Sequence, residues 1–143
     1  MDIFSTFKVA GSALQAQRIR LDTISSNLAN AETTRTPEGG PYKRKDVYFQ
    51  TTPASFDSQL DANLRGAVQG VEVSQILVDQ EPPRLVYDPA HPDAGADGYV
   101  AMPNVSVLKE TVDMMSATRS YEANTTSIKS AKRMAMKALD IGR

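Results

Sequence analysis

The chain has 143 residues, of which 41% are hydrophobic, so it has room for one domain with a modest core and is too short for a large enzyme fold. Its 16 basic and 17 acidic residues give a net charge of -1, which supplies no overall field for nucleic acid or for an anionic membrane. The absence of cysteine excludes disulfide scaffolds and thiolate zinc sites, and His91 is the only histidine. Charged residues interrupt the N-terminal segment and every longer apolar run, so we expect neither a cleaved signal peptide nor membrane insertion.

All eight prolines lie between positions 37 and 103. Because proline costs about 3 kcal/mol inside a helix, the proline-free ends predict two helices and the middle predicts a non-helical insert. The sequence therefore predicts an α+β chain, in which long N- and C-terminal helices pair as a coiled coil and the middle forms a small β-rich insert. We place the paired helices at residues 1–30 and 104–143, and the insert at residues 31–103 as an outer domain.

In the N-terminal segment, apolar side chains recur with the alternating spacing of four and three residues that is typical of a coiled-coil seam. The seam reads Ile3, Phe7, Ala10, Leu14, Gln17, Leu21, Ile24 and Leu28, with Gln17 as its one polar member. A helix of about 27 residues is about 40 Å long, which a small insert cannot cover. We therefore expect another helix to bury this stripe.

The middle of the chain contains four short runs of β-branched and aromatic residues that are bounded by glycine and proline. They predict strands at residues 46–51, 71–78, 84–87 and 98–101, which we interpret as one small antiparallel unit. Two further segments, residues 31–41 and residues 88–97, are rich in turn formers and predict exposed loops. Most of the aromatic residues also lie in the insert, which predicts that compact packing is concentrated there.

Two features of the insert suggest chemistry, and each also has a simpler structural interpretation. His91 lies in a loop with three aspartates, Asp88, Asp93 and Asp97. A small metal-dependent enzyme could use this set, but its spacing matches neither a zinc motif nor an EF-hand, which favours a turn-rich surface loop. Residues 43–45 read Lys-Arg-Lys beside aromatic residues and could contact single-stranded nucleic acid, although an edge-strand or subunit-contact role is favoured. No spacing places a base beside a nucleophile and no cofactor motif is present, so we expect no catalysis, cofactor or metal.

In the C-terminal segment, Asn104 after Pro103 predicts the N-cap of a helix that ends at the stop signal Gly142. The apolar stripe of this helix is softer than the first one and shifts phase, as at a stutter in a coiled coil. It begins with Leu108, Val112 and Met115 and continues with Thr118, Tyr121, Thr125, Ile128, Ala131, Ala135 and Leu139.

Two stripes of this length exceed what a small insert can cover, so we expect the helices to pair within the subunit and to pack laterally between subunits. A contact between copies that does not close on itself builds a helical filament. We assign subunit packing to ten residues of the two stripes, namely Phe7, Leu14, Leu21, Ile24, Leu28, Val112, Met115, Tyr121, Ile128 and Leu139. The alternative that stays open is a coiled-coil adaptor, or a subunit like that of a secretion needle, that caps another assembly.

Several blocks of the sequence resemble flagellar axial proteins, the family of bacterial rod and hook subunits. Residues 26–33 read Ser-Asn-Leu-Ala-Asn-Ala-Glu-Thr, which is similar to the Asn-rich turn that ends the N-terminal helix in this family. The insertion at residues 34–42 departs from the shorter form of the hook and distal-rod members and resembles the proximal-rod branch, as do residues 82–93 and 98–124. We assign the axial-protein motif to Asn27, Leu28, Ala29, Asn30, Thr33 and Tyr42.

This resemblance implies a structural subunit of the proximal rod of the flagellar basal body, the drive shaft that transmits torque across the periplasm. In this family the paired terminal helices form an inner layer, called D0, around a central channel, and the middle of the chain forms an outer domain. Members leave the cell through the flagellar type III export apparatus without a cleaved signal peptide. The implied partners are copies of the chain itself, the rod proteins FlgB, FlgF and FlgG, and the adaptor FliE beside the MS ring, with no nucleic acid.

Overall fold

The computed structural model describes residues 3–52 and 69–141, which form two long helices and two small antiparallel sheets. Helix α1 covers Ile3–Ala29 and helix α3 covers Val107–Ile141. The strands are β1 (Lys45–Thr51), β2 (Val71–Val78), β3 (Arg84–Tyr87) and β4 (Tyr99–Met102). The predicted fold class, an α+β chain with long terminal helices and a small β-rich insert, is confirmed, and each observed strand begins and ends within one residue of its predicted bounds.

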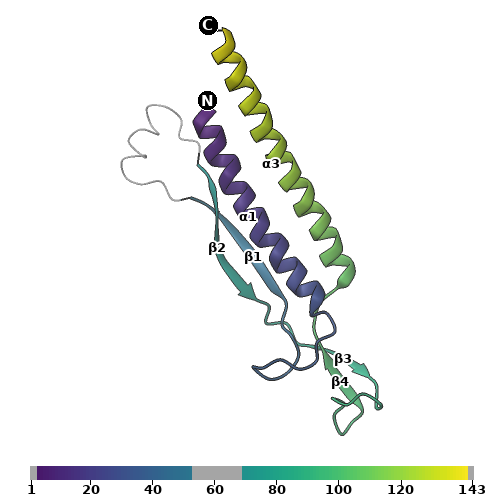
Figure 1. Cartoon of the computed structure of the whole chain (residues 1–143). Coiled ribbons are helices and arrows are strands. Elements are labelled where there is room, and N and C mark those ends of the chain that lie inside the picture. The colour runs from purple at the N-terminus through teal and green to yellow at the C-terminus, as the bar shows by residue number, and fades with distance from the viewer. Residues whose placement is uncertain (1–2, 53–68, 142–143) are drawn as a thin grey trace.

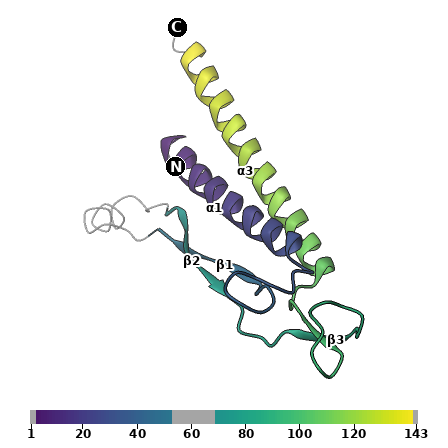
Figure 2. The same cartoon turned by 60° about the horizontal axis from the view of Figure 1, so that its bottom comes forward.

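The two helices lie side by side and antiparallel, so the two ends of the chain lie at the same end of the pair (Figure 1). Helix α1 is the middle layer, because it packs against α3 on one side and against both β1 and β2 on another. The β3–β4 sheet lies beyond the opposite end of the helices, close to where α1 ends and α3 begins (Figure 2). At 1.5 Å per residue α3 is about 12 Å longer than α1, and its C-terminal turns project past the start of α1 (Figure 1).

Small side chains fill the space between the helices. The most deeply buried residues of α3 are Glu110, Ala117 and Ala131, and those of α1 include Ala10 and Ala16. Alanine lets two helix backbones approach closely but contributes little apolar area, so this interface is thin. Among the predicted seam residues of α1, Ile24 is buried, which agrees with the expectation that another element covers this stripe.

The β1–β2 ladder is hydrogen-bonded to α1 at the end where Thr51 pairs with Val71. The Ser12 hydroxyl donates a hydrogen bond to the carbonyl of Val9 (2.8 Å) and accepts one from the backbone N–H of Val71 (3.1 Å). Gly70 sits against this serine, and a Cβ there would lie only 2.8 Å from the Ser12 hydroxyl oxygen. The ladder carries a bulge at Ser74, since the register shifts between Tyr48 and Phe49.

The insert differs from the prediction in two respects. Its strands form two separate ladders, β1–β2 and β3–β4, rather than one antiparallel unit. Prolines 82 and 83 separate β2 from β3, and because they lack an N–H group they cannot extend a ladder. The expectation of compact packing in the insert is also wrong, because most residues of the described strands are exposed, including Tyr87 and Tyr99, whose rings pack edge to face at 5.3 Å.

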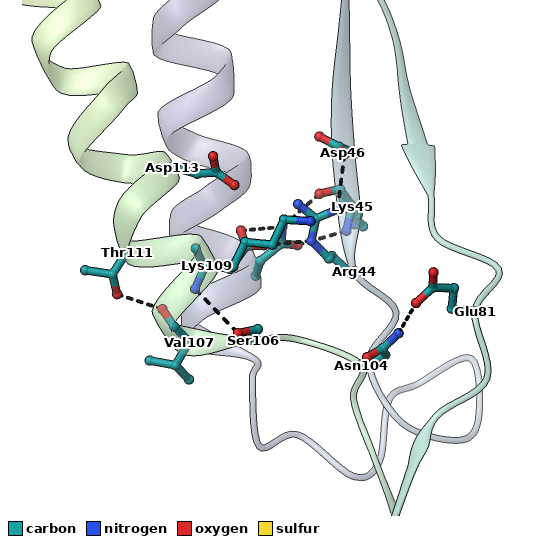
Figure 3. Close-up of polar contacts among 12 residues, drawn as sticks. Arg44, Lys45, Asp46, Glu81, Asn104, Ser106, Val107, Lys109, Thr111 and Asp113 are labelled. Carbon is teal, nitrogen blue, oxygen red and sulfur yellow. Dashed lines mark hydrogen bonds and ion pairs between the residues drawn. The ribbon is translucent and has the colours of Figure 1, made fainter.

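The start of α3 is a further correction. The helix begins at Val107, and Ser106 rather than Asn104 is its N-cap: the Ser106 hydroxyl accepts a hydrogen bond from the N–H of Lys109 (3.4 Å). The Asn104 side chain instead donates to the Glu81 carboxylate in the chain leading to β3 (Figure 3). The predicted stop at Gly142 lies outside the described residues.

Candidate functional site

Asn27 of the axial-protein motif lies at the point where α1, the start of β1 and the first turn of α3 meet. Its amide group donates to the Lys45 carbonyl (2.8 Å) and to Oε2 of Glu110 (3.1 Å). Its oxygen accepts from the Lys45 N–H (2.9 Å) and from the Tyr42 hydroxyl (3.0 Å). Both donors and both lone pairs of the side chain are therefore used, and the residue is only 1% exposed.

Glu110 is the charged centre of this junction. It is completely buried, and its Oε1 accepts a hydrogen bond from Nε of Arg44 (2.7 Å) while its Oε2 accepts from Asn27. Two accepting oxygens are the pattern of an ionised carboxylate. Arg44 reaches toward the first turns of α3 from the residue before β1 and also contacts Asp46 at 3.1 Å (Figure 3). We call Asn27, Arg44 and Glu110 the junction cluster.

The charge of Arg44 is secured by its partners. Burial acts to lower the pKa of this guanidinium, but its hydrogen bonds to Glu110 and Asp46 and their negative charges outweigh burial and raise the pKa above its ordinary value. Arg44 is therefore held by acidic side chains from both α3 and β1. Beside it lies a cavity of about 20 Å³, which is too small for an organic ligand and has room for about one water molecule.

The remaining motif residues shape the turn that follows α1. The Asn30 side chain donates to the Ser26 carbonyl (2.9 Å), and the Thr33 hydroxyl donates to the Asn30 side-chain oxygen (3.2 Å). The N–H of Tyr42 then donates to the Thr33 carbonyl (3.0 Å), which closes the loop at residues 34–41. Leu28 is half-buried and Ala29 is exposed at the end of the helix. The motif residues therefore end α1 and direct the chain into β1.

The two predicted loops contact each other. Asp93 accepts hydrogen bonds from the Thr34 hydroxyl (2.8 Å) and from the guanidinium of Arg35 (2.6 Å), so residues 31–41 are tied to residues 88–97. His91 uses its Nδ1 to accept the N–H of Asp93 (3.1 Å). No cluster of three or more histidine, aspartate or glutamate side chains in the described part of the chain could hold a metal ion.

The basic triplet at residues 43–45 does not form one surface patch. Arg44 points inward to Glu110, and the ammonium of Lys45 lies 5.9 Å from the centre of the Tyr42 ring. The middle cation is therefore unavailable for nucleic acid, and its role is structural within the chain.

The ten predicted packing residues divide between two environments. On α1, Ile24 is buried and Phe7, Leu14, Leu21 and Leu28 are half-buried. On α3, Ile128 is half-buried, whereas Val112, Met115, Tyr121 and Leu139 are exposed, by 55% for Val112 and 74% for Leu139.

The face that α3 turns to α1 therefore differs from the first part of its predicted stripe, whereas the second part includes the buried Ala131 and the half-buried Ile128. It follows Glu110, Ala117 and Ala131, while Leu108, Val112 and Met115 lie on the opposite side of the helix. The sequence pattern selects the largest apolar side chains, but the interface uses small ones and a charged one. A carboxylate in the first turn of a helix usually compensates the helix dipole at the surface, so no signal in the sequence marked Glu110 as buried.

Known proteins match both ends of the chain. The family model described as "Flagella basal body rod protein" matches residues 7–35, which include most of α1 and the motif turn. The model described as "Flagellar basal body rod FlgEFG protein C-terminal" matches residues 96–141, which include β4 and α3. The two matches, over most of α1 with the motif turn and over β4 with α3, place the chain in the class of flagellar basal-body rod proteins.

Three relatives, each named flagellar basal-body rod protein FlgC, resemble the chain over its whole length. The chain is 51% identical to that of Bacillus subtilis strain 168, over 100% of both chains. It is 45% identical to that of Borreliella burgdorferi, over 99% of this chain and 98% of the relative, and 44% identical to that of Salmonella typhimurium, over 99% of each. The chain belongs to the FlgC family of flagellar basal-body rod proteins, as the sequence blocks indicated. Within residues 3–52 and 69–141, no helix is both long and apolar enough to cross a membrane.

Proposed function

We propose that this chain is a structural subunit of the flagellar basal-body rod and that it polymerises through its terminal helices. The observation that supports this proposal most strongly is the distribution of side-chain size on α3. Alanines face α1, whereas Leu108, Val112 and Met115 face away from it and are exposed. Three large apolar residues at helical spacing on a surface are typical of a face that another protein covers.

Exposed apolar side chains also occur on other parts of α3. They lie at Tyr121, Met134, Met136, Leu139 and Ile141, and the last four lie on turns that project past α1 or close to that point. In a monomer these residues would remain in water. Burial of a Leu or Met side chain contributes about 1.5–3 kcal/mol, so covering several of them supplies a substantial driving force for assembly.

The finer assignments follow from membership of the family. We place residues 1–30 and 104–143 in the inner D0 layer of the proximal rod and residues 31–103 in an outer domain. The chain reaches the periplasm through the flagellar type III apparatus, contacts copies of itself and FlgB, FlgF, FlgG and FliE beside the MS ring, and transmits torque without catalysing a reaction. The packing residues in this assembly are Phe7, Leu14, Leu21, Ile24, Leu28, Val112, Met115, Tyr121, Ile128 and Leu139.

The test is to place a charge on the exposed stripe. Val112→Asp leaves the isolated chain folded, because this side chain is 55% exposed, but it prevents rod assembly and swimming, because an unpaired carboxylate would be buried against a neighbouring subunit. Circular dichroism of the purified chain and basal-body preparations from the same strain give the two readouts.

Ser127→Asp is the matched control, since it introduces the same charge at an exposed, already polar position on a different side of α3. It should retain swimming. Normal rods in the Val112→Asp strain would refute a role of this stripe in assembly.

A further inference from the structure

We infer that the junction cluster fixes the axial register of α1 against α3. In this view Glu110 and its two partners are positioning residues, whose task is to select one of several similar pairings of the two helices. The inference concerns the single chain and does not depend on the partners proposed above.

Away from the junction, the helix interface specifies its register weakly. Glu110, Ala117, Asn124 and Ala131 follow one another at intervals of seven residues along the inner face of α3. A slip of α3 by one heptad, which is about 10 Å, therefore exchanges only alanine and asparagine side chains at the levels beyond Glu110. The buried α1 residues Ala10 and Ala16 would accept either arrangement, because alanine has no shape that distinguishes them.

Gln17, the polar member of the α1 seam, does not resolve this ambiguity. Its side-chain oxygen is buried and has no hydrogen-bond partner within the described part of the chain. Because this oxygen has no hydrogen bond in the observed register, a slip of the helices would break none.

The junction cluster does distinguish the registers. The Glu110 carboxylate meets donors from two different segments, Arg44 at 2.7 Å and Asn27 at 3.1 Å. A heptad slip would carry Glu110 about 10 Å from both and leave the Arg44 cation without its buried partner. The neighbouring Arg20–Asp113 pair, at 3.7 Å and about one-third exposed, fits the same register but is too solvated to enforce it.

The register determines what the chain presents to its neighbours. The C-terminal turns of α3 that project past α1 carry Leu139 and Ile141, both exposed. A slip by one heptad would almost double this projection or nearly remove it, and the exposed apolar residues would change height relative to the insert. A buried polar cluster is well suited to this task, because polar residues in helix interfaces can fix register at a cost in stability.

The test removes the polarity of the cluster while keeping its volume. In the double variant Arg44→Met with Glu110→Leu, Asn27 keeps both of its hydrogen bonds to the Lys45 backbone. Because the chain has no cysteine, single cysteines introduced at the exposed positions Lys8 and Ser116 can carry spin labels without side reactions. Starting from the contact of Asn27 with Glu110, these positions are separated by about 13 residues along the pair, or about 20 Å, so their distance responds strongly to a slip.

In the purified full-length chain with its native cluster, we expect one narrow distance distribution by pulsed electron paramagnetic resonance. In the double variant, we expect unchanged helix content, with a distance that shifts or splits by several ångströms, about 5–10 Å for a slip of one heptad. The control Arg20→Met with Asp113→Leu removes the exposed pair and should leave the distance unchanged.

Three outcomes would overturn the inference. An unchanged narrow distance in the double variant would show that packing alone sets the register. Loss of folding in the double variant would show that the cluster is required for stability itself. A broad distribution in the chain with its native cluster would show that no register is defined.

Discussion

The sharpest test of the motif is the substitution Asn27→Ala, which removes four hydrogen bonds at once. Two of the former partners keep another contact: Glu110 retains Arg44, and the Tyr42 hydroxyl retains the Ser26 hydroxyl at 3.3 Å. The N–H and carbonyl of Lys45 lose the only partners that connect them to α1. The cost of the substitution is therefore set mainly by these two backbone groups.

Leaving such a partly buried backbone group unsatisfied costs up to about 1–3 kcal/mol, so two of them predict a loss of at most about 2–6 kcal/mol in the free energy of unfolding. Single domains are stable by about 5–15 kcal/mol, which makes this a large fraction of the total. Urea unfolding of the purified chain, followed by circular dichroism, measures the difference between the variant and the parent.

Asn30→Ala is the matched control. It removes an asparagine of the same motif whose side chain bonds only to neighbouring residues of the turn, Ser26 and Thr33, so we expect a loss below about 1 kcal/mol. Equal losses for the two variants, or a loss below about 1 kcal/mol for Asn27→Ala, would refute the conclusion that Asn27 joins the helices to the insert.

Three further substitutions test the attachment of the insert to α1, the stability of α1 itself and the contact between the two loops. Gly70→Ala places a Cβ 2.8 Å from the Ser12 hydroxyl, which is held by its own hydrogen bonds, and should lower the free energy of unfolding by about 1–3 kcal/mol in urea titrations. Gly11→Ala has nothing within 4 Å of the new methyl group and should raise it by about 0.5–1 kcal/mol, because alanine favours the helix; a loss would contradict this. Asp93→Ala should accelerate amide hydrogen exchange at residues 34–40 with little change in the unfolding midpoint, because its partner Arg35 is largely exposed, and unchanged exchange would contradict the contact between the two loops.

The sequence predicts the strands well because their signals are local. Each strand is a run of β-branched or aromatic residues that glycine or proline terminates, and β2, at Val71–Val78, coincides with its predicted bounds. The helices are predicted for the same reason, since the proline-free ends leave no competing structure. The division of the strands into two ladders was missed, because strand signals of this kind do not say which strands pair.

The inner face of α3 could not be predicted by the same reasoning. Apolar periodicity assigns the largest residues to the nearest interface, and so in the first half of α3 it placed Val112 and Met115 in the seam instead of Ala117, although the predicted stripe of the second half does include the buried Ala131. The partner of Glu110 comes from residue 44, far away in the sequence, and no local pattern connects an arginine before a strand with a glutamate in a helix. Long-range charge pairs of this kind become visible only when the fold has placed them together.

The exposed stripe and the thin interface have one common explanation. Alanines bury little area, so pairing α1 with α3 yields modest stability in the single chain. The larger apolar side chains of α3 face outward, and in the proposed assembly neighbouring subunits cover them, which would stabilise the folded form by mass action. In such an arrangement, hydrophobic area drives assembly between chains, while polar contacts define the geometry within the chain.

The junction cluster defines geometry within the chain. Its buried charges add little net stability, but they are unpaired in any arrangement other than the one observed. A subunit that must fit an ordered shaft needs polar contacts of this kind. A helix pair with several equivalent registers would present its outer apolar residues at several different heights relative to the insert.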